Sequence, residues 1–282
     1  MDKFWRAEAM IRSAQSPGLR IEPVVPATRS QLRRIHTDAY LASIEQNTLP
    51  RPAAVRLGLP ASAALLARSA LEVGGTLGAM RAARDDGLAC NLAGGTHHAF
   101  PDRGLGYCVL NDVAIAIAEL RLTAPAARVF VIDTDAHQGN GTNGIFAADA
   151  NVFTYSIHVG KNYPAEKTPG SLDVPLPRYV DGVDYLDQLE ATLTPAFEAF
   201  APEFVFWIAG ADLHEHDRFG QMKLTTAHFA ARDHQVLKIV TAGSVPTAVL
   251  YGGGYNRDRV MTARLHADTV LRVAQAAGTD RL

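Results

Sequence analysis

The chain has 282 residues, 48% of them hydrophobic, and a formal net charge of -2. This length suffices for a single domain with a large core. The composition and the charge indicate neither membrane insertion nor nucleic-acid binding. No apolar export signal opens the chain, and its two cysteines lie in apolar contexts, so we expect a cytoplasmic protein with free thiols.

Helical and strand patterns alternate along the chain, without repeats or low-complexity linkers. In chain order they predict a helix over residues 61–84, a strand over 89–92, a helix over 111–122, strands over 129–132 and 152–157, a helix over 185–200, a strand over 204–208, a helix over 226–240, a strand over 245–250 and a helix over 258–277. This alternation predicts right-handed crossovers and a single α/β domain with a mostly parallel central sheet and helices on both faces.

Two acids and a histidine follow the strand predicted at residues 129–132. Alternate side chains of an extended chain point the same way, so Asp133, Asp135 and His137 can converge at the carboxyl end of this strand. Open α/β sheets usually place their sites at this edge. A divalent metal would explain such a costly group of polar side chains, whereas an acidic strand exit that only caps the next helix is the alternative.

Other strand ends also carry groups with chemical potential. A glycine pair precedes His97 and His98, which are either an acid/base pair or ordinary loop histidines. Asp212 follows the strand at residues 204–208, as a helix cap or a ligand. Three glycines precede Tyr255, whose hydroxyl can donate a hydrogen bond. A phosphate-binding loop competes there, but no Lys or Ser/Thr completes a P-loop.

Taken in order, these segments resemble the histone deacetylase superfamily, with its acetoin-utilisation and acetylpolyamine-amidohydrolase relatives. The resemblance implies the arginase/deacetylase fold and runs from about Arg29 to Asn256. The segment at residues 136–141 is more similar to class IV and related bacterial members than to class I enzymes. The matching motifs are Gly94-Gly95-Thr96-His97-His98-Ala99, Gly106-Tyr107-Cys108-Val109-Leu110-Asn111-Asp112, Asp133-Thr134-Asp135-Ala136-His137-Gln138-Gly139-Asn140-Gly141, Ala209-Gly210-Ala211-Asp212 and Gly252-Gly253-Gly254-Tyr255-Asn256.

Position by position, the resemblance implies one catalytic Zn²⁺ with three protein ligands, and Fe²⁺ accepts the same set. The implied ligands are Asp135, His137 and Asp212. The implied reaction is attack of metal-activated water on the carbonyl of an acylated amine. The residues implied to move protons and donate to the oxyanion are His97, His98 and Tyr255, with Asp133 orienting His97 and Asn140 holding His98.

The resemblance also implies a substrate tunnel and a structural monovalent cation. The tunnel residues would be Gly106, Tyr107, Tyr163, Phe219 and Gly253, with ordinary core packing as the alternative for Tyr163 and Phe219. A K⁺ or Na⁺ ion would be bound by the main-chain carbonyls of Asp133, Asp135, His137, Ser156 and Ile157.

Some positions depart from the family pattern. Gln138 and Asn140 stand where class I enzymes have His and Asp, so we expect the pKa of His98 to be less elevated than in a His–Asp pair. We interpret His214 and His216 as surface loop histidines. The first four residues resemble a segment that follows an initial strand and loop, so we expect the family's N-terminal edge strand to be missing.

Several functions fit these residues. The leading hypothesis is removal of an acetyl or another acyl group from acyl-lysine or a similar amine. The alternatives are a deacetylase of acetylpolyamines or other small amides, an arginase-like ureohydrolase and an inactive binding module. Ureohydrolases place a second metal ligand where this chain has Gly139, and an inactive module would be expected to lose Tyr255 or a histidine of the pair. The sequence does not indicate the acyl chain or the oligomeric state.

Overall fold

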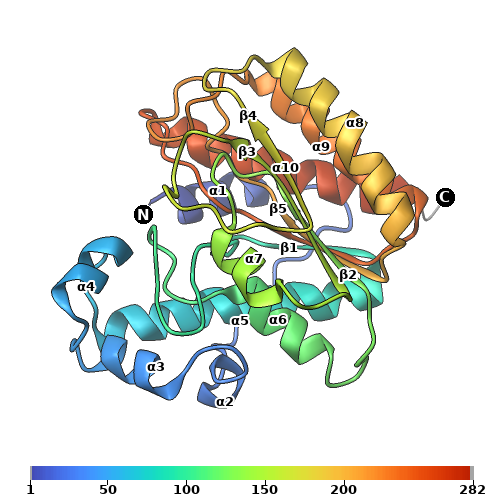
Figure 1. Ribbon diagram of the computed structural model, residues 1–282. Coiled ribbons are helices and arrows are strands. Elements are labelled where there is room, and N and C mark those ends of the chain that lie inside the picture. Colours follow the sequence, from blue (N-terminus) through green and yellow to red (C-terminus); the bar gives the residue numbers. More distant parts are fainter. Residues whose placement is uncertain (1, 280–282) are drawn as a thin grey trace.

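The computed structural model describes residues 2–279, which form one α/β domain around a single sheet (Figure 1). The strands lie in the order β1-β6-β5-β2-β3-β4, and every pairing is parallel. Their bounds are β1 Leu88–Asn91, β2 Val129–Asp133, β3 Val152–Val159, β4 Leu172–Leu176, β5 Phe204–Ile208 and β6 Thr247–Leu250. The predicted fold class is confirmed, and all carboxyl ends meet at one edge of the sheet.

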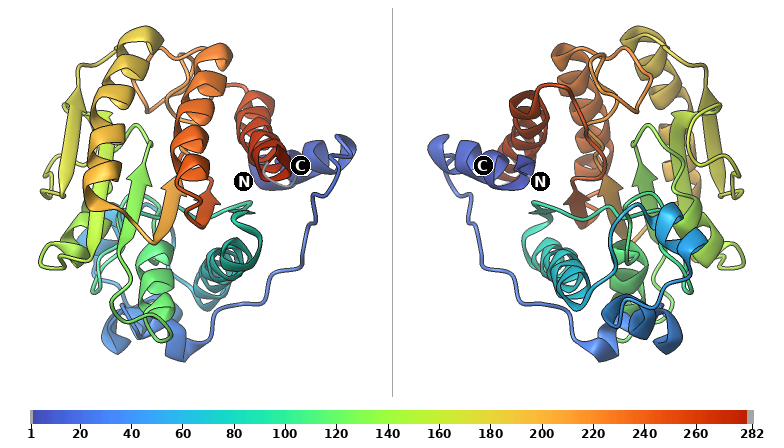
Figure 2. Two further views of the ribbon diagram at one scale, coloured as in Figure 1. Left: turned by 90° about the vertical axis from the view of Figure 1, so that its right-hand side faces the viewer. Right: turned by 90° about the vertical axis from the view of Figure 1, so that its left-hand side faces the viewer.

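Helices cover both faces of this sheet (Figure 2). Helices α5 and α6 lie on one face with the short helices α2 to α4, whereas α8, α9 and α10 lie on the other. The helix bounds are α1 Lys3–Ser13, α2 Arg29–Leu32, α3 Asp38–Glu45, α4 Arg51–Leu57, α5 Ala63–Asp86, α6 Asp112–Leu120, α7 Asn140–Phe146, α8 Gly182–Phe200, α9 Thr226–Ala242 and α10 Arg259–Thr279. Within the described residues, no helix is both long and apolar enough to cross a bilayer.

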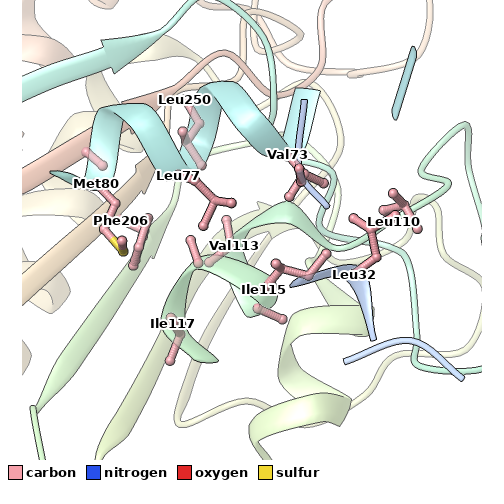
Figure 3. Close-up of a cluster of buried hydrophobic side chains, with 14 of the residues drawn as sticks. Leu32, Val73, Leu77, Met80, Leu110, Val113, Ile115, Ile117, Phe206 and Leu250 are labelled. Atoms are coloured by element: carbon pink, nitrogen blue, oxygen red, sulfur yellow. The ribbon is translucent and has the colours of Figure 1, made fainter. Parts of the chain in front are cut away.

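The strand pattern divides the core in two, because alternate residues of a strand face opposite sides of the sheet. In β5, Phe206 packs with α5 and α6 (Figure 3), whereas Trp207 packs on the α8 and α9 side. Both strands that carry acidic exits, β2 and β5, are buried along their whole length. The edge where the acids emerge is therefore held by a packed core on both faces.

The sequence patterns missed one strand and several short helices. Strand β4 was not predicted, because Pro175 interrupts it and proline cannot donate to a neighbouring strand. It is tolerated because β4 lies at the edge of the sheet and pairs only with β3. Helices α1 to α4 and α7 were also not predicted. Cys90 and Cys108 are free thiols, as expected.

The N-terminal segment wraps the domain. Helix α1 packs against α10, and the chain then runs in an extended path down to α2 (Figure 2). On the way it crosses α5, where the amide of Ala27 donates to the carbonyl of Ala70 at 2.8 Å. Gly74 of α5 allows this crossing, because a Cβ there would overlap the carbonyl oxygen of Val25. The start of α1, at Lys3, thereby lies next to the loop that follows β6.

We expect Phe206→Ala to lower the free energy of unfolding by about 3–5 kcal/mol, because it leaves a cavity between β5 and the α5–α6 layer. The matched control is Val183→Ala on α8, where the side chain is 60% exposed and the change should stay within about 0.5 kcal/mol. Denaturant unfolding measures both values. Equal losses in the two variants would contradict the assignment of the core.

Buried His36 should make stability depend on pH. Burial lowers its pKa from 6.5 to about 4, and its Nε2 accepts a hydrogen bond from the amide of Asn111 at 2.9 Å. Between these two pKa values the unfolded chain binds the proton and the native state does not. The contribution of His36 to the free energy of unfolding is therefore fully present well above pH 6.5 and is lost as the pH falls toward 4. The loss from this group alone is about 3 kcal/mol.

Replacing this histidine with a residue that does not titrate should remove that loss. We expect His36→Gln to make the fall in thermal stability between pH 6.5 and 5 less steep, with the remaining slope due to other buried histidines such as His158. His234→Gln, at an exposed position of α9, should leave the slope unchanged. Identical slopes for wild type and His36→Gln would contradict the prediction.

Candidate active site

Two buried carboxylates and an imidazole converge where β2 and β5 end. His137 Nδ1 lies 3.0 Å from Asp135 Oδ1 and 2.9 Å from Asp212 Oδ2. One ligand atom from each residue lies within 4.8 Å of the others, and all three side chains are buried. Asp135 and His137 come from the exit of β2 and Asp212 from the exit of β5, so parallel pairing of these strands brings the distant acid into place.

This group suits a small divalent cation. Around a tetrahedral Zn²⁺ with bonds near 2.0 Å, neighbouring ligand atoms lie roughly 3.3 Å apart, which is close to the observed separations. Burial opposes a charge on His137, but the hydrogen bonds and charges of Asp135 and Asp212 outweigh it and hold its pKa well above the ordinary value. Burial beside Asp135 also raises the pKa of Asp212 to about 7. The cluster therefore favours a bound cation, and metal binding would displace the proton.

Backbone amides complete the cradle. Asp135 Oδ2 accepts from the amide of Gly253 at 2.7 Å, and Asp212 Oδ1 accepts from the amide of Ala136 at 3.0 Å. Gly253 was expected on the substrate side; the structure places it against the carboxylates, where a Cβ would lie 2.5 Å from Asp212 Oδ2. These fixed donors offset part of the cost of burying negative charge.

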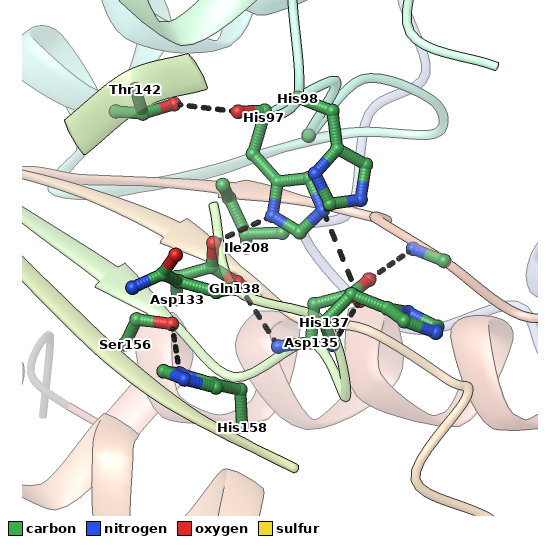
Figure 4. A network of polar contacts seen from close by, with 12 residues as sticks. His97, His98, Asp133, Asp135, His137, Gln138, Thr142, Ser156, His158 and Ile208 are labelled. Atoms are coloured by element: carbon green, nitrogen blue, oxygen red, sulfur yellow. Dashed lines mark hydrogen bonds and ion pairs between the residues drawn. The ribbon is translucent and has the colours of Figure 1, made fainter. Parts of the chain in front are cut away.

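The two predicted histidines lie beside Asp133, Asp135 and His137 (Figure 4). Each of the two has its own partner. His97 Nδ1 lies 2.6 Å from Asp133 Oδ2, and His98 Nδ1 lies 2.9 Å from Asn140 Oδ1. Both partner oxygens accept, so each Nδ1 carries a proton. The Nε2 atoms of the pair lie 3.1 Å apart, which makes a hydrogen bond when one ring carries a second proton.

Electrostatics assigns that second proton to His97. Burial works against its charged form, but the Asp133 carboxylate outweighs burial and raises the pKa of His97 to about 9. Burial, together with the charges of His97 and His137, lowers the pKa of His98 well below its ordinary value. The hydrogen bond to Asn140 opposes this lowering, and the expectation that His98 is less basic than in a His–Asp pair stays a prediction. Neighbouring groups with separated pKa values are typical of acid/base sites.

The loop that carries the histidine pair is anchored by Asp112 at the start of α6. Its carboxylate accepts from the amides of Gly95 at 3.0 Å and Thr96 at 2.8 Å. Asn111 caps the same helix and donates to the carbonyl of Ala99 at 3.1 Å. In the motif at residues 106–112, the last two residues thus support the histidine loop, whereas Tyr107 near its start reaches the surface.

Aromatic side chains surround the approach to the cluster. The Tyr163 ring lies edge-on to His98, with ring centroids 4.9 Å apart. The centroid of the Tyr255 ring lies 5.8 Å from that of Tyr107 and 5.3 Å from that of Phe219. Tyr107, Tyr163 and Phe219 are 47%, 38% and 41% exposed. Core packing does not account for such exposure, which is typical of a binding surface.

Lys3 was not predicted to take part but lies under the loop of Tyr255. Its Nζ lies 3.4 Å from the carbonyl oxygens of both Gly252 and Gly254 and 5.3 Å from the centroid of the Tyr255 ring. Burial lowers the pKa of its ammonium group, while Asp212 and other acids oppose that effect. No spacing in the sequence linked a lysine in α1 to a loop near residue 250.

The structure also places the two loop histidines and Gly139. His214 is buried and its Nδ1 lies 2.8 Å from the Asn256 amide nitrogen, so its interpretation as a surface residue was wrong; His216 is exposed, as expected. A Cβ at Gly139 would lie 2.5 Å from Asp133 Oδ2, which leaves no room for a second metal ligand there. The monovalent-cation site stays a prediction.

A parallel α/β sheet whose strand exits hold a three-ligand metal cradle beside a polarised histidine pair defines a metallohydrolase type of site. The model of the histone deacetylase domain matches residues 2–271, and the chain belongs to this family. It is accordingly a hydrolase that acts on amide bonds.

Individual relatives agree with this assignment. An uncharacterised protein of Picosynechococcus sp. is 40% identical over 84% of this chain and 79% of its own. Histone deacetylase 2 of Arabidopsis thaliana is 29% identical over 89% of this chain and 66% of its own, and acetoin utilization protein AcuC of Staphylococcus aureus is 32% identical over 61% and 47%. A solved structure of a histone deacetylase homolog complexed with SAHA has a TM-score of 0.80 and 27% identity, over 98% of this chain and 77% of its own.

We expect removal of a bound divalent ion to destabilise the protein, because the ion binds the native cluster and not the unfolded chain. At a free metal concentration 100 times the Kd, the stabilisation is about 2.7 kcal/mol. Thermal unfolding with added Zn²⁺ and with a chelator measures the difference. His137→Ala should abolish the metal-dependent shift and exposed His216→Ala should keep it. A shift that persists in His137→Ala would contradict the assigned cradle.

Proposed function

We propose that this protein is a Zn²⁺-dependent deacylase that removes an acetyl or another acyl group from acyl-lysine or a similar amine. The observation that carries the proposal is the asymmetric pairing of His97 with Asp133 and of His98 with Asn140 beside the three-ligand cluster. Such a pair offers a neutral base and a charged donor at one place, as amide hydrolysis requires.

A divalent ion bound in the cradle would polarise an amide carbonyl and lower the pKa of water. His98 is neutral, and its Nε2 accepts the hydrogen bond from charged His97. When that contact opens, the Nε2 lone pair takes a proton from the attacking water. Nε2 of the charged His97 lies 3.9 Å from Oδ1 of Asp135, which puts this positive charge beside the cluster. Its field would stabilise the negative charge that develops on the reacting carbonyl there. The proton gained at His98 then passes to the leaving amine nitrogen, and the C–N bond breaks.

Tyr255 is proposed to donate to the oxyanion that forms on the carbonyl oxygen. Burial, together with the charges of Asp135 and Asp212, raises the pKa of its hydroxyl above the usual value, so the proton stays in place at neutral pH. A partly buried, neutral donor near a cationic centre is suited to oxyanion stabilisation.

The aromatic rim supports an aliphatic amine as the substrate. Tyr107, Tyr163 and Phe219 can cover the methylenes of a lysine side chain, which gain from apolar burial. A solved structural relative was complexed with SAHA, and we expect the same compound to bind here. Acylated polyamines and other small acylated amides present the same reacting group and remain the alternative substrate class.

The ureohydrolase alternative is less well supported. Among residues 2–279 a single group has the three-ligand geometry of a metal site. Gly139 has no side chain to bind a second ion, and a Cβ at this position would lie 2.5 Å from Asp133 Oδ2.

The test is turnover of a panel of acyl-lysine peptides, acylated polyamines and arginine by the Zn²⁺-loaded enzyme. We expect hydrolysis of an acylated amine, inhibition by SAHA, and a loss on the order of 10²- to 10³-fold in kcat for Tyr255→Phe. Tyr185→Phe is the matched control, because its buried hydroxyl makes no hydrogen bond within the described part of the chain. Full activity in Tyr255→Phe, or turnover of arginine alone, would overturn the proposal.

A further inference from the structure

A single carboxylate outside the metal cluster joins two loops of the site. Asp217 lies in the loop that follows Asp212. Its Oδ1 accepts from the amides of Phe219 at 2.8 Å and Gly220 at 3.0 Å, and its Oδ2 accepts from the amide of Tyr255 at 2.6 Å. One side chain therefore links the turn of an aromatic wall to the backbone of the tyrosine.

The turn at Phe219 and Gly220 is itself fixed on its other side. The amide group of Asn162 donates to the carbonyl of Phe219 at 2.7 Å, and His137 Nε2 lies 3.3 Å from the same oxygen. A Cβ at Gly220 would overlap the carbonyl oxygen of Asp212, so the turn rests directly on the backbone of a proposed metal ligand. It is a rigid reference point next to the cluster.

The backbone of Tyr255 needs such a reference point. It follows an arm of three glycines, of which Gly252 and Gly254 have φ values of 67° and 148° that other residues rarely adopt. Glycine has more conformational freedom to lose than any other residue, so this arm does not fix the tyrosine by itself. The hydrogen bond to Asp217 holds the end of the arm against the turn, and Arg218 Nε donates to the Tyr255 carbonyl at 3.1 Å.

We propose that Asp217 is the positioning residue for Tyr255: it sets the distance between the tyrosine hydroxyl and the reacting carbonyl by tying the glycine arm to the Phe219–Gly220 turn. The inference rests on the proposed function, in which Tyr255 donates to the oxyanion. The side-chain hydrogen bonds of Asp217 go to the backbone of Phe219, Gly220 and Tyr255 and not to the three cluster residues, so its effect on the rate should pass through Tyr255.

Asp217→Asn separates this role from general support of the loop. The amide side chain has one acceptor oxygen, which can keep both bonds to the turn, and its NH₂ group then faces the N–H of Tyr255, where two donors cannot pair. We expect kcat to fall by about 10- to 100-fold, in line with the cost of displacing a group by an ångström. KM and metal content should stay within about twofold, because the wall and the cradle are preserved.

The matched control is Asp149→Asn. This carboxylate also accepts from a backbone amide, that of Asn151 at 3.0 Å, and pairs with Arg121, but it lies at the amino end of β3. We expect unchanged kcat. Should Asp217→Asn fail to fold, Asp217→Glu replaces it, because it keeps the charge and both oxygens but moves them by one methylene.

The decisive measurement is the double variant with Tyr255→Phe. If Asp217 acts through the tyrosine, Asp217→Asn should lower kcat by less than about twofold once the hydroxyl is gone, because coupled residues are not additive. An equal loss in both backgrounds would overturn this inference and leave the proposed function intact. Full activity in Tyr255→Phe alone would overturn both.

Discussion

The structure depends on the crowding of three buried carboxylates at one edge of the sheet. Asp133 and Asp135 leave β2, Asp212 leaves β5, and none of them is more than 3% exposed. Unpaired, such charges would cost several kcal/mol each. They are compensated in two ways. His97 pairs with Asp133, whereas His137, backbone amides and the cation that their geometry favours compensate Asp135 and Asp212.

This compensation also produces the chemistry. The charge on Asp133 draws a proton to His97, and burial together with the resulting imidazolium lowers the pKa of neighbouring His98. A carboxylate placed behind one histidine thus creates a charged donor and a neutral base from two identical side chains. Asn140, an amide, holds His98 without adding a charge that would oppose this difference.

Much of this could be predicted from the sequence. Alternation along an extended chain predicted that Asp135 and His137 converge, but β2 ends at Asp133 and both residues lie in the bend that follows it. The parallel sheet implied by the alternation of helices and strands brought Asp212 to the same edge. The resemblance to the family separated Asp133 from the proposed ligands, and the short distance to His97 agrees with that arrangement. The motif at Gly252–Tyr255 predicted the loop but not what holds it.

The missed features depend on contacts between distant loops. Asp217 and Asn162 lie in irregular segments without periodicity, and their partners are backbone groups, which leave no trace in residue type. His214 was interpreted as a surface loop histidine together with His216, yet it turns inward toward Asn256. Strand β4 was missed because Pro175 is acceptable only at a sheet edge, and edge position is a property of the whole fold.

The central claim is that one cation binds between Asp135, His137 and Asp212, while Asp133 stays behind to charge His97. A crystal structure of the Zn²⁺-loaded protein, with anomalous scattering recorded at the zinc edge, tests it most directly. The account predicts a single anomalous peak bonded to one atom of each of the three ligands, with the Asp133–His97 hydrogen bond intact. A peak bonded to Asp133, or a second peak nearby, would contradict it.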